Sequence, residues 1–421
     1  MSTSTPPRPH DSFAALRIRD FSLFLSSRFL LTLGVQIQSV VVGIQITKLT
    51  GDPWMLGLIG LSEAIPFIAV ALFAGHVADV VRRKRIMLLA ALFLALASWA
   101  LFAVSFDEQL LLSFGTLPVY GIIFCTGIAR GFLGPVFPAM LSQLVPRALY
   151  ANAATWQSNL WQTASVLGPA LGGIIFGTLG VLPAYAICSA LITGSLFFAF
   201  FITDHPLPLR EKKEPLLQSL TSGFRFVFSN QVMLSAFSLD LFAVLFGGAV
   251  AMIPLFSQNV LHAGENADFV TGLLRSAPAI GAILTGLVLT KFPPTRHAGR
   301  NLYIAVIGFG LCIIGFAFSE FLWLSFLLLI ASGAFDSISV VVRSTILQLL
   351  TPDNMRGRVA AVNGIFIGSS NEIGEFESGA AARIFGLQRS VAIGGCMTIF
   401  VVIMVMLSAP RLRKLNLNKL T

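Results

Sequence analysis

Apolar runs long enough to cross a membrane follow one another along almost the whole chain. About twenty consecutive apolar residues span the hydrocarbon core of a bilayer, and residues 54–78 and 86–106 both reach that length. Hydrophobic residues make up 56% of the 421 residues and charged residues only 11%, whereas a soluble domain carries roughly 25% charged residues. The chain is therefore predicted to be an all-α, polytopic membrane protein.

Twelve transmembrane helices are predicted from these runs. They cover about residues 21–47, 54–79, 86–106, 112–143, 151–178, 181–203, 231–259, 267–291, 300–319, 321–350, 357–386 and 391–409. The prediction divides the chain into a tail (1–20), a six-helix half (21–203), a polar linker (204–230), a second six-helix half (231–409) and a second tail (410–421). Residues 1–20 are polar and do not have the pattern of a secretory signal.

The distribution of basic residues orients these helices. Arg and Lys collect in short cytosolic loops. If both termini are cytosolic, 21 of the 28 Lys and Arg residues fall on the cytosolic side and two, Lys48 and Arg389, fall on the opposite side. The other five lie within spans: Arg28, Arg130, Arg275, Arg343 and Arg383. We therefore expect both termini to lie in the cytosol. We expect the chain to be a multi-pass protein of the plasma membrane, here a bacterial inner membrane. The net charge of +9 does not indicate nucleic-acid binding, because the bases are dispersed over short loops.

The loop at residues 75–85, GHVADVVRRKR, carries a motif. It resembles the loop between helices 2 and 3 of the major facilitator superfamily, G-x-x-A-D-x-x-G-R-K, although Arg82 replaces the second Gly. The residues on the pattern are Gly75, Ala78, Asp79, Arg83 and Lys84. A basic loop is also an ordinary topology signal in membrane proteins.

The resemblance implies a contact for this loop. Asp79 should approach the start of the eleventh predicted helix, near Gly357 and Arg358, because the positive end of a helix attracts an anion. It also implies a fold of two six-helix halves that rock about a central site.

The fifth predicted helix contains a glycine-rich segment. Its residues Gly168, Pro169, Gly172 and Gly173 resemble the G-P-x-x-G-G of superfamily antiporters. Proline kinks a helix and glycine lets a neighbouring helix approach closely. A kink that serves packing alone is the alternative interpretation.

An internal repeat supports the two halves. A shift of 206 residues places Gly127 on Gly333, Pro146 on Pro352, Gly168 on Gly374 and Gly173 on Gly379. At the same shift Arg130 aligns with Asp336. The two halves are therefore predicted to have the same arrangement of helices but opposite charges at that position.

Residues 346–364, ILQLLTPDNMRGRVAAVNG, resemble a narrower group. This is the drug-antiporter group that includes macrolide exporters and the enterobactin exporter. The resemblance implies a proton-coupled exporter of a small amphipathic molecule of the drug or siderophore class, acting as a monomer. A proton-coupled importer of the same fold and a non-transporting receptor or scaffold remain alternatives.

Charged residues inside the spans are the candidate functional groups. Each costs about 2.5–3.5 kcal/mol at a helix centre, so each should pair or face a cavity. The candidates for the substrate pathway are Arg28, Gln36, Arg130, Asp336, Glu372 and Glu375. Asn371, Glu372, Glu375, Ser378 and Gly379 share one helical stripe, which we expect to face the interior between the halves, with Arg130 as a candidate basic partner.

Asp240 is the first candidate for the proton carrier, with Glu63 and Glu375 as alternatives. It is the sole acid in its span, and its neighbours along the chain are apolar. A carboxyl group shielded from water can load and release protons near neutral pH. The competing interpretation is a structural ion pair with a base such as Arg28 or Arg275.

Motifs typical of enzymes and cofactor sites are missing from the sequence. There is no G-x-x-x-x-G-K-[ST] loop for ATP and no H-E-x-x-H pair for zinc. The four cysteines lie in apolar runs without metal-ligand spacing. We expect neither enzymatic activity nor a metal or other cofactor; the expected partners are a small-molecule substrate, protons and lipid.

Overall fold

The computed structural model describes residues 13–107, 109, 113–206, 216–292, 294, 296–352 and 355–415. These residues are almost entirely helical. Eleven helical stretches among them are long and apolar enough to cross a membrane. The predicted all-helical membrane fold is therefore confirmed.

The first half contains six long helices. They are α1 (Arg19–Thr50), α2 (Pro53–Val80), α3 (Arg83–Phe106), α5 (Leu117–Leu144), α6 (Tyr150–Leu179) and α7 (Val181–Phe200). Helix α5 begins later than predicted, because Gly115 adopts a left-handed backbone with φ 58°, a conformation that interrupts a helix.

The second half follows a short connecting helix, α8 (Leu216–Ser229). Its helices are α9 (Gln231–Phe246), α10 (Ala249–Asn259), α11 (Ala267–Lys291), α12 (Ala298–Ala317), α13 (Leu322–Leu350), α14 (Arg356–Phe385), α15 (Leu387–Ser408) and the short α16 (Pro410–Arg413).

Two of these helices differ from the simple prediction. The span predicted at 231–259 is divided at Gly247 and Gly248 into α9 and α10, because two adjacent glycines favour a break in a helix. The backbone of α14 at Gly374 packs directly against Gly248. Helix α14 covers the predicted segment 357–386 but is too polar to count among the eleven apolar stretches. A total of twelve spans therefore stays a prediction.

The internal repeat is visible in the helix boundaries. Adding 206 to the bounds of α5 gives 323–350, and α13 covers 322–350. The same shift carries α6 onto 356–385, the bounds of α14, and the start of α7 onto 387, the start of α15. The second three helices of each half therefore share one plan.

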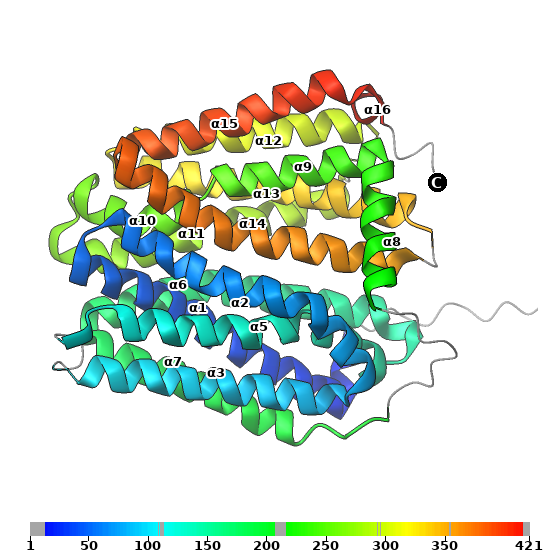
Figure 1. Ribbon diagram of the computed structural model, residues 1–421, viewed down its shortest axis with the longest axis horizontal. Helices are drawn as coiled ribbons and strands as arrows, with labels where there is room; N and C mark the ends of the chain where they lie inside the picture. Colours follow the sequence, from blue (N-terminus) through cyan, green and yellow to red (C-terminus); the bar gives the residue numbers. More distant parts are fainter. Residues whose placement is uncertain are drawn as a thin grey trace, which may run out of the picture.

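The helices of the two halves run side by side, with α2 against α14 at the boundary (Figure 1). We call one end of this bundle the Gly51 end, which holds the connections at 51–52, 180, 260–266 and 386. The other is the Arg82 end, which holds the connections at 81–82, 145–149, 292–297 and 351–355. Helix α8 runs across the helix ends at the Arg82 end (Figure 1).

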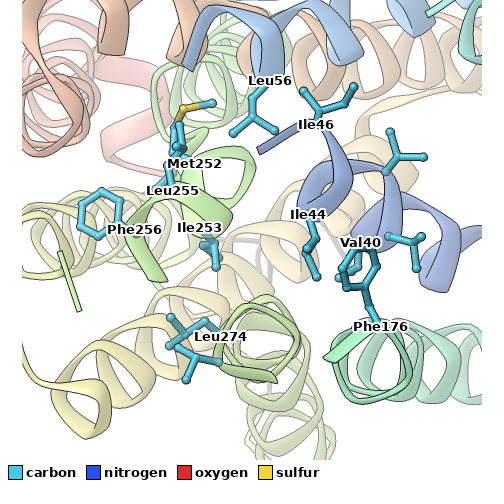
Figure 2. Packing of buried hydrophobic residues seen from close by; sticks show 14 of the residues in the cluster. Val40, Ile44, Ile46, Leu56, Phe176, Met252, Ile253, Leu255, Phe256 and Leu274 are labelled. Carbon is cyan, nitrogen blue, oxygen red and sulfur yellow. The ribbon is translucent and has the colours of Figure 1, made fainter. Parts of the chain in front are cut away.

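Among the described residues, the buried apolar core is shared between the halves at the Gly51 end. One buried cluster there combines residues of α1, α2 and α6 with residues of α10 and α11, and Figure 2 shows Val40, Leu56 and Phe176 beside Met252 and Leu274. Each of the other buried clusters of described residues lies within one half. The halves are therefore sealed together at the Gly51 end and packed separately toward the Arg82 end.

Candidate functional site

Arg130 on α5 joins acids from both halves. Its Nη1 pairs with Oε1 of Glu63 on α2, in the same half, and lies 3.4 Å from Oε1 of Glu372 on α14, in the other half. The Arg130 side chain is 38% exposed, although it lies at the boundary between the halves. This ion pair therefore borders solvent-accessible space and not only packed protein.

Glycine residues allow α2 and α14 to bring these acids together. A Cβ atom at Gly60 would lie 2.6 Å from the carbonyl oxygen of Glu372 and 2.6 Å from Cβ of Glu375. One turn away, a Cβ atom at Gly57 would lie 3.0 Å from Cα of Gly379. Small residues at helix contacts permit this backbone approach, so the two helices cross at glycine and place the polar stripe of α14 beside α2.

Arg275 on α11 adds a second base from the second half. Its Nη1 and Nη2 donate hydrogen bonds to the carbonyl oxygen and Oγ of Ser39 on α1, at 3.2 and 3.4 Å. Glu375 interacts electrostatically with Arg275 and with Arg130. We call the five residues Glu63, Arg130, Arg275, Glu372 and Glu375 the charge cluster; its formal charge is that of three acids against two bases.

Asp240 belongs to a separate ion pair. It lies on α9 and pairs with Arg343 of α13, and the two side chains are 8% and 6% exposed. Asp336, on the same helix as Arg343, interacts electrostatically with both. The partner is thus neither Arg28 nor Arg275, the two bases suggested from the sequence, and the pair lies wholly within the second half.

Two further ion pairs link the halves at the Gly51 end. Lys48 Nζ on α1 lies 2.6 Å from Asp268 on α11. Arg383 on α14 lies 3.3 Å from Asp52, the residue that caps α2. We call these the latch pairs. The sequence placed Lys48 outside the spans and Arg383 within one, and gave no sign that either base would meet an acid of the other half.

The glycine-rich segment of α6 contacts two different helices. Gly168 packs against Gln36 of α1, and Gly172 packs against Ile37 and Val40 of the same helix. A Cβ atom at Gly173 would lie 2.7 Å from Cα of Gly272 on α11, and one at Gly272 would lie 2.6 Å from the carbonyl oxygen of Pro169. This segment therefore forms a second glycine contact between the halves.

The basic loop at the Arg82 end is tied to its own half. Arg83 donates to the carbonyl oxygen of Ala139, and Lys84 donates to that of Phe200, both at 2.8 Å. Gly75 has no neighbour that a Cβ atom would meet within 4 Å. The side chains of Asp79 and of residues 356–357 lie outside the described residues, so the contact of Asp79 with the start of α14 stays a prediction.

The polar side chains of α1 have different roles. Gln45 is structural, because it donates to Ser105 at 2.9 Å and accepts from the Tyr185 hydroxyl at 2.7 Å. Arg28 lies over the ring of Phe137, 4.6 Å from its centroid.

The whole helical bundle, with both halves and the charge cluster, lies within the match to one known family. The sequence profile of a family described as "Transmembrane secretion effector" matches residues 10–420. The chain belongs to this family. Transmembrane secretion effectors are transporters of the major facilitator superfamily, not enzymes, and this chain is a multi-pass inner-membrane protein related to efflux transporters.

Individual relatives of this chain are distant but cover most of its length. The enterobactin exporter EntS of Citrobacter koseri is 25% identical over 402 residues, which cover 94% of this chain and 92% of the relative. The multidrug resistance protein MdtG of Salmonella paratyphi C is 25% identical over 346 residues, 81% of this chain and 82% of the relative.

Solved structures share the fold at lower identity. The nucleoside transporter NupG superposes with a TM-score of 0.72 at 16% identity and covers 92% of this chain and 98% of its own. A bacterial homologue of the lysosomal transporter Spinster gives a TM-score of 0.68 at 16% identity and covers 94% of this chain and 96% of its own. These similarities show the major facilitator fold and nothing about the substrate.

Proposed function

We propose that this transporter exports a small amphipathic molecule from the cytosol in exchange for protons. The description of its family as a secretion effector supports export, and so do the names of its relatives, an enterobactin exporter and a multidrug resistance protein. The substrate path lies between two halves of a single chain, so a monomer is sufficient.

The Arg82 end faces the cytosol in this proposal. It carries the basic residues of the 75–85 loop, as expected for a cytosolic loop. The structure then corresponds to a state that is closed toward the periplasm by the shared apolar cluster and the latch pairs. Rocking of the halves would open the Gly51 end and release substrate there.

The proposal of proton coupling rests on the ion pairs of Arg130. It has one acid partner in its own half, Glu63, and one in the other, Glu372. When the halves part at the Gly51 end, Glu63 moves with Arg130 and Glu372 is left behind. A carboxylate in a membrane helix that loses its cation is strongly favoured to take up a proton, so Glu372 would be loaded from the periplasm and unloaded on return.

Asp240 is the second candidate for the carrier. Its partner Arg343 lies in the same half, so rocking of the halves leaves this pair intact. A group whose surroundings do not change between the two states has no reason to load on one side and unload on the other. We therefore place the proton at the charge cluster and assign Asp240 a structural role.

The test is transport in proteoliposomes that contain the purified protein, with enterobactin and a lipophilic dye as probes. An imposed pH gradient should drive accumulation by the wild type and by a Glu320→Gln control, since Glu320 is exposed in the α12–α13 connection. Glu372→Gln should retain substrate exchange without a gradient but lose gradient-driven accumulation. If Glu372→Gln still accumulates substrate in response to the gradient and Asp240→Asn does not, Asp240 is the carrier.

Direction of flux separates export from the alternatives. Everted vesicles, whose cytosolic face is outside, should take up the probe when their interior is acidified. Uptake only by right-side-out vesicles would indicate an importer. A receptor or scaffold would show no flux and would tolerate neutral substitution at both Glu372 and Asp240.

A further inference from the structure

Arg28 differs from the four other arginines that lie within the predicted spans. Arg130, Arg275, Arg343 and Arg383 each bind a carboxylate, a carbonyl or a hydroxyl group. Arg28 lies over the face of the Phe137 ring, and its Nε and Nη1 atoms are buried without a hydrogen-bond partner among the described residues. A buried guanidinium group is costly unless an anion or a hydrogen-bond acceptor meets it. The described residues supply no such group to the buried nitrogens of Arg28.

The stripe of α1 that carries Arg28 also carries a residue in contact with the other half. Eleven residues separate Arg28 from Ser39, which is three turns plus about 20°, so both lie on one stripe. Ser39 accepts hydrogen bonds from Arg275 of the second half and is nevertheless exposed. Arg28 thus lies on the same side of α1 as Ser39, which we call the interior face, and about 16 Å nearer the Arg82 end.

The buried apolar clusters of the described residues are separate at that level. The buried cluster around Phe24 and Val136 contains residues of the first half alone, and the cluster around Phe237 and Val342 contains residues of the second half alone. Arg28 therefore lies beside the region where a molecule from the Arg82 end would enter between the halves.

The groups around Arg28 indicate what it would bind. A planar guanidinium group offers five N–H donors in a fixed geometry that suits the oxygens of a carboxylate or phosphate. The ring of Phe137 covers one side of Arg28, and Phe24 meets that ring edge-on with centroids 6.1 Å apart. An anionic group next to an aromatic or aliphatic body satisfies both features.

We propose that Arg28 binds the anionic group of the transported molecule, and that the substrates are therefore amphipathic organic anions. The inference rests on the proposed transport function but concerns the substrate class and not the driving force. Carboxylate and phosphate chemistry is shared by anionic lipid headgroups, so the test includes a lipid.

The experiment measures binding without transport. Purified protein in neutral detergent is heated, and unfolding is followed by tryptophan fluorescence in the presence of 1-naphthoate, its methyl ester or 1-naphthylmethylammonium. Naphthoate at millimolar concentration should raise the unfolding temperature of the wild type, and the ester and the cation should not. Arg28→Met should weaken this effect roughly tenfold or more, as expected for loss of a charge-assisted pair.

Two further variants keep the test decisive. Arg85→Met is the matched control, because Arg85 is exposed and lies outside the interior face; it should respond as the wild type does. Arg28→Lys keeps the charge but loses the planar fork, so it should weaken naphthoate binding several-fold, and it replaces Arg28→Met if that variant does not fold.

Three results would overturn the proposal. They are equal stabilisation by the ester, an unchanged naphthoate effect in the folded Arg28 variants, and no naphthoate effect in the wild type. Stabilisation by dioleoylphosphatidylglycerol but not by naphthoate would assign Arg28 to a lipid headgroup and also overturn it. This experiment measures binding and not flux. A negative binding result therefore does not contradict export, and a negative export result does not contradict anion binding by Arg28.

Discussion

The buried pair of Asp240 and Arg343 should behave as a structural unit when either partner is removed. Both side chains are almost completely shielded from solvent, and removing one partner of a buried pair leaves an uncompensated charge at a cost of about 3–5 kcal/mol. With an unfolding entropy of roughly 2.1 cal/mol/K per residue, that cost lowers the unfolding temperature of a chain of 421 residues by about 3–6 °C.

The two single variants should lose different amounts of stability. After Asp240→Leu, Arg343 still faces Asp336, so the loss should lie near about 3 kcal/mol. After Arg343→Met, Asp240 and Asp336 face each other without a base, so the loss should approach about 5 kcal/mol. The double variant removes both charges of the pair and leaves Asp336 as the one acid without its base, so it should be more stable than Arg343→Met, which leaves two such acids.

The assay is thermal unfolding in detergent at one fixed heating rate, because membrane proteins commonly unfold irreversibly and their midpoints depend on scan rate. Substrate exchange in proteoliposomes is measured on the same four proteins. If the losses of the single variants simply add in the double variant, the two residues are not coupled and the structural interpretation of this pair is wrong.

Three further predictions concern the boundary between the halves. Lys48→Ala removes a latch pair whose base is 48% exposed, worth about 0.2–1 kcal/mol; labelling of a single cysteine introduced into the seal at the Gly51 end should therefore become faster by up to about fivefold, and an unchanged rate would contradict the latch. Gly173→Val should abolish transport at normal expression because its Cβ would lie 2.7 Å from the facing glycine backbone, whereas Gly286→Val, which has open space around it, should transport normally. Arg130→Gln should lower the unfolding temperature more than the double variant Arg130→Gln/Glu372→Gln, because the single change leaves acids without their base; the opposite order would show that the two are not partners.

The sequence predicted the helices well because membrane helices are set by local composition. The predicted segments 151–178 and 321–350 agree with α6 and α13 within about two residues. The division of the seventh segment was not predicted, although a Gly-Gly pair such as Gly247–Gly248 is a local signal for a break. The packing of α14 against Gly248, more than 120 positions later in the chain, has no such local signal.

The partners of the charged residues were predictable only in part. Arg343 follows Asp336 by seven residues, two helical turns, and so lies on the same face; that spacing could have suggested Arg343 as a base for the acids of this region. The pairing of Lys48 with Asp268 spans 220 positions and depends on how the two halves dock, which no local pattern records. A single sequence gives the candidate charges inside the membrane but not the assignment of one to another.

The glycine contacts between the halves have a consequence for the speed and balance of the transport cycle. At Gly57 with Gly379 and at Gly173 with Gly272, backbone meets backbone, so closing the Gly51 end there immobilises no side chains. A leucine or isoleucine in each of these four places would lose about 0.5–1 kcal/mol of rotamer entropy at every closure. In the proposed rocking cycle, these glycine contacts would therefore open and close without repeatedly ordering side chains. The preference between the open and closed states would then depend on the ion pairs and on the apolar cluster around them.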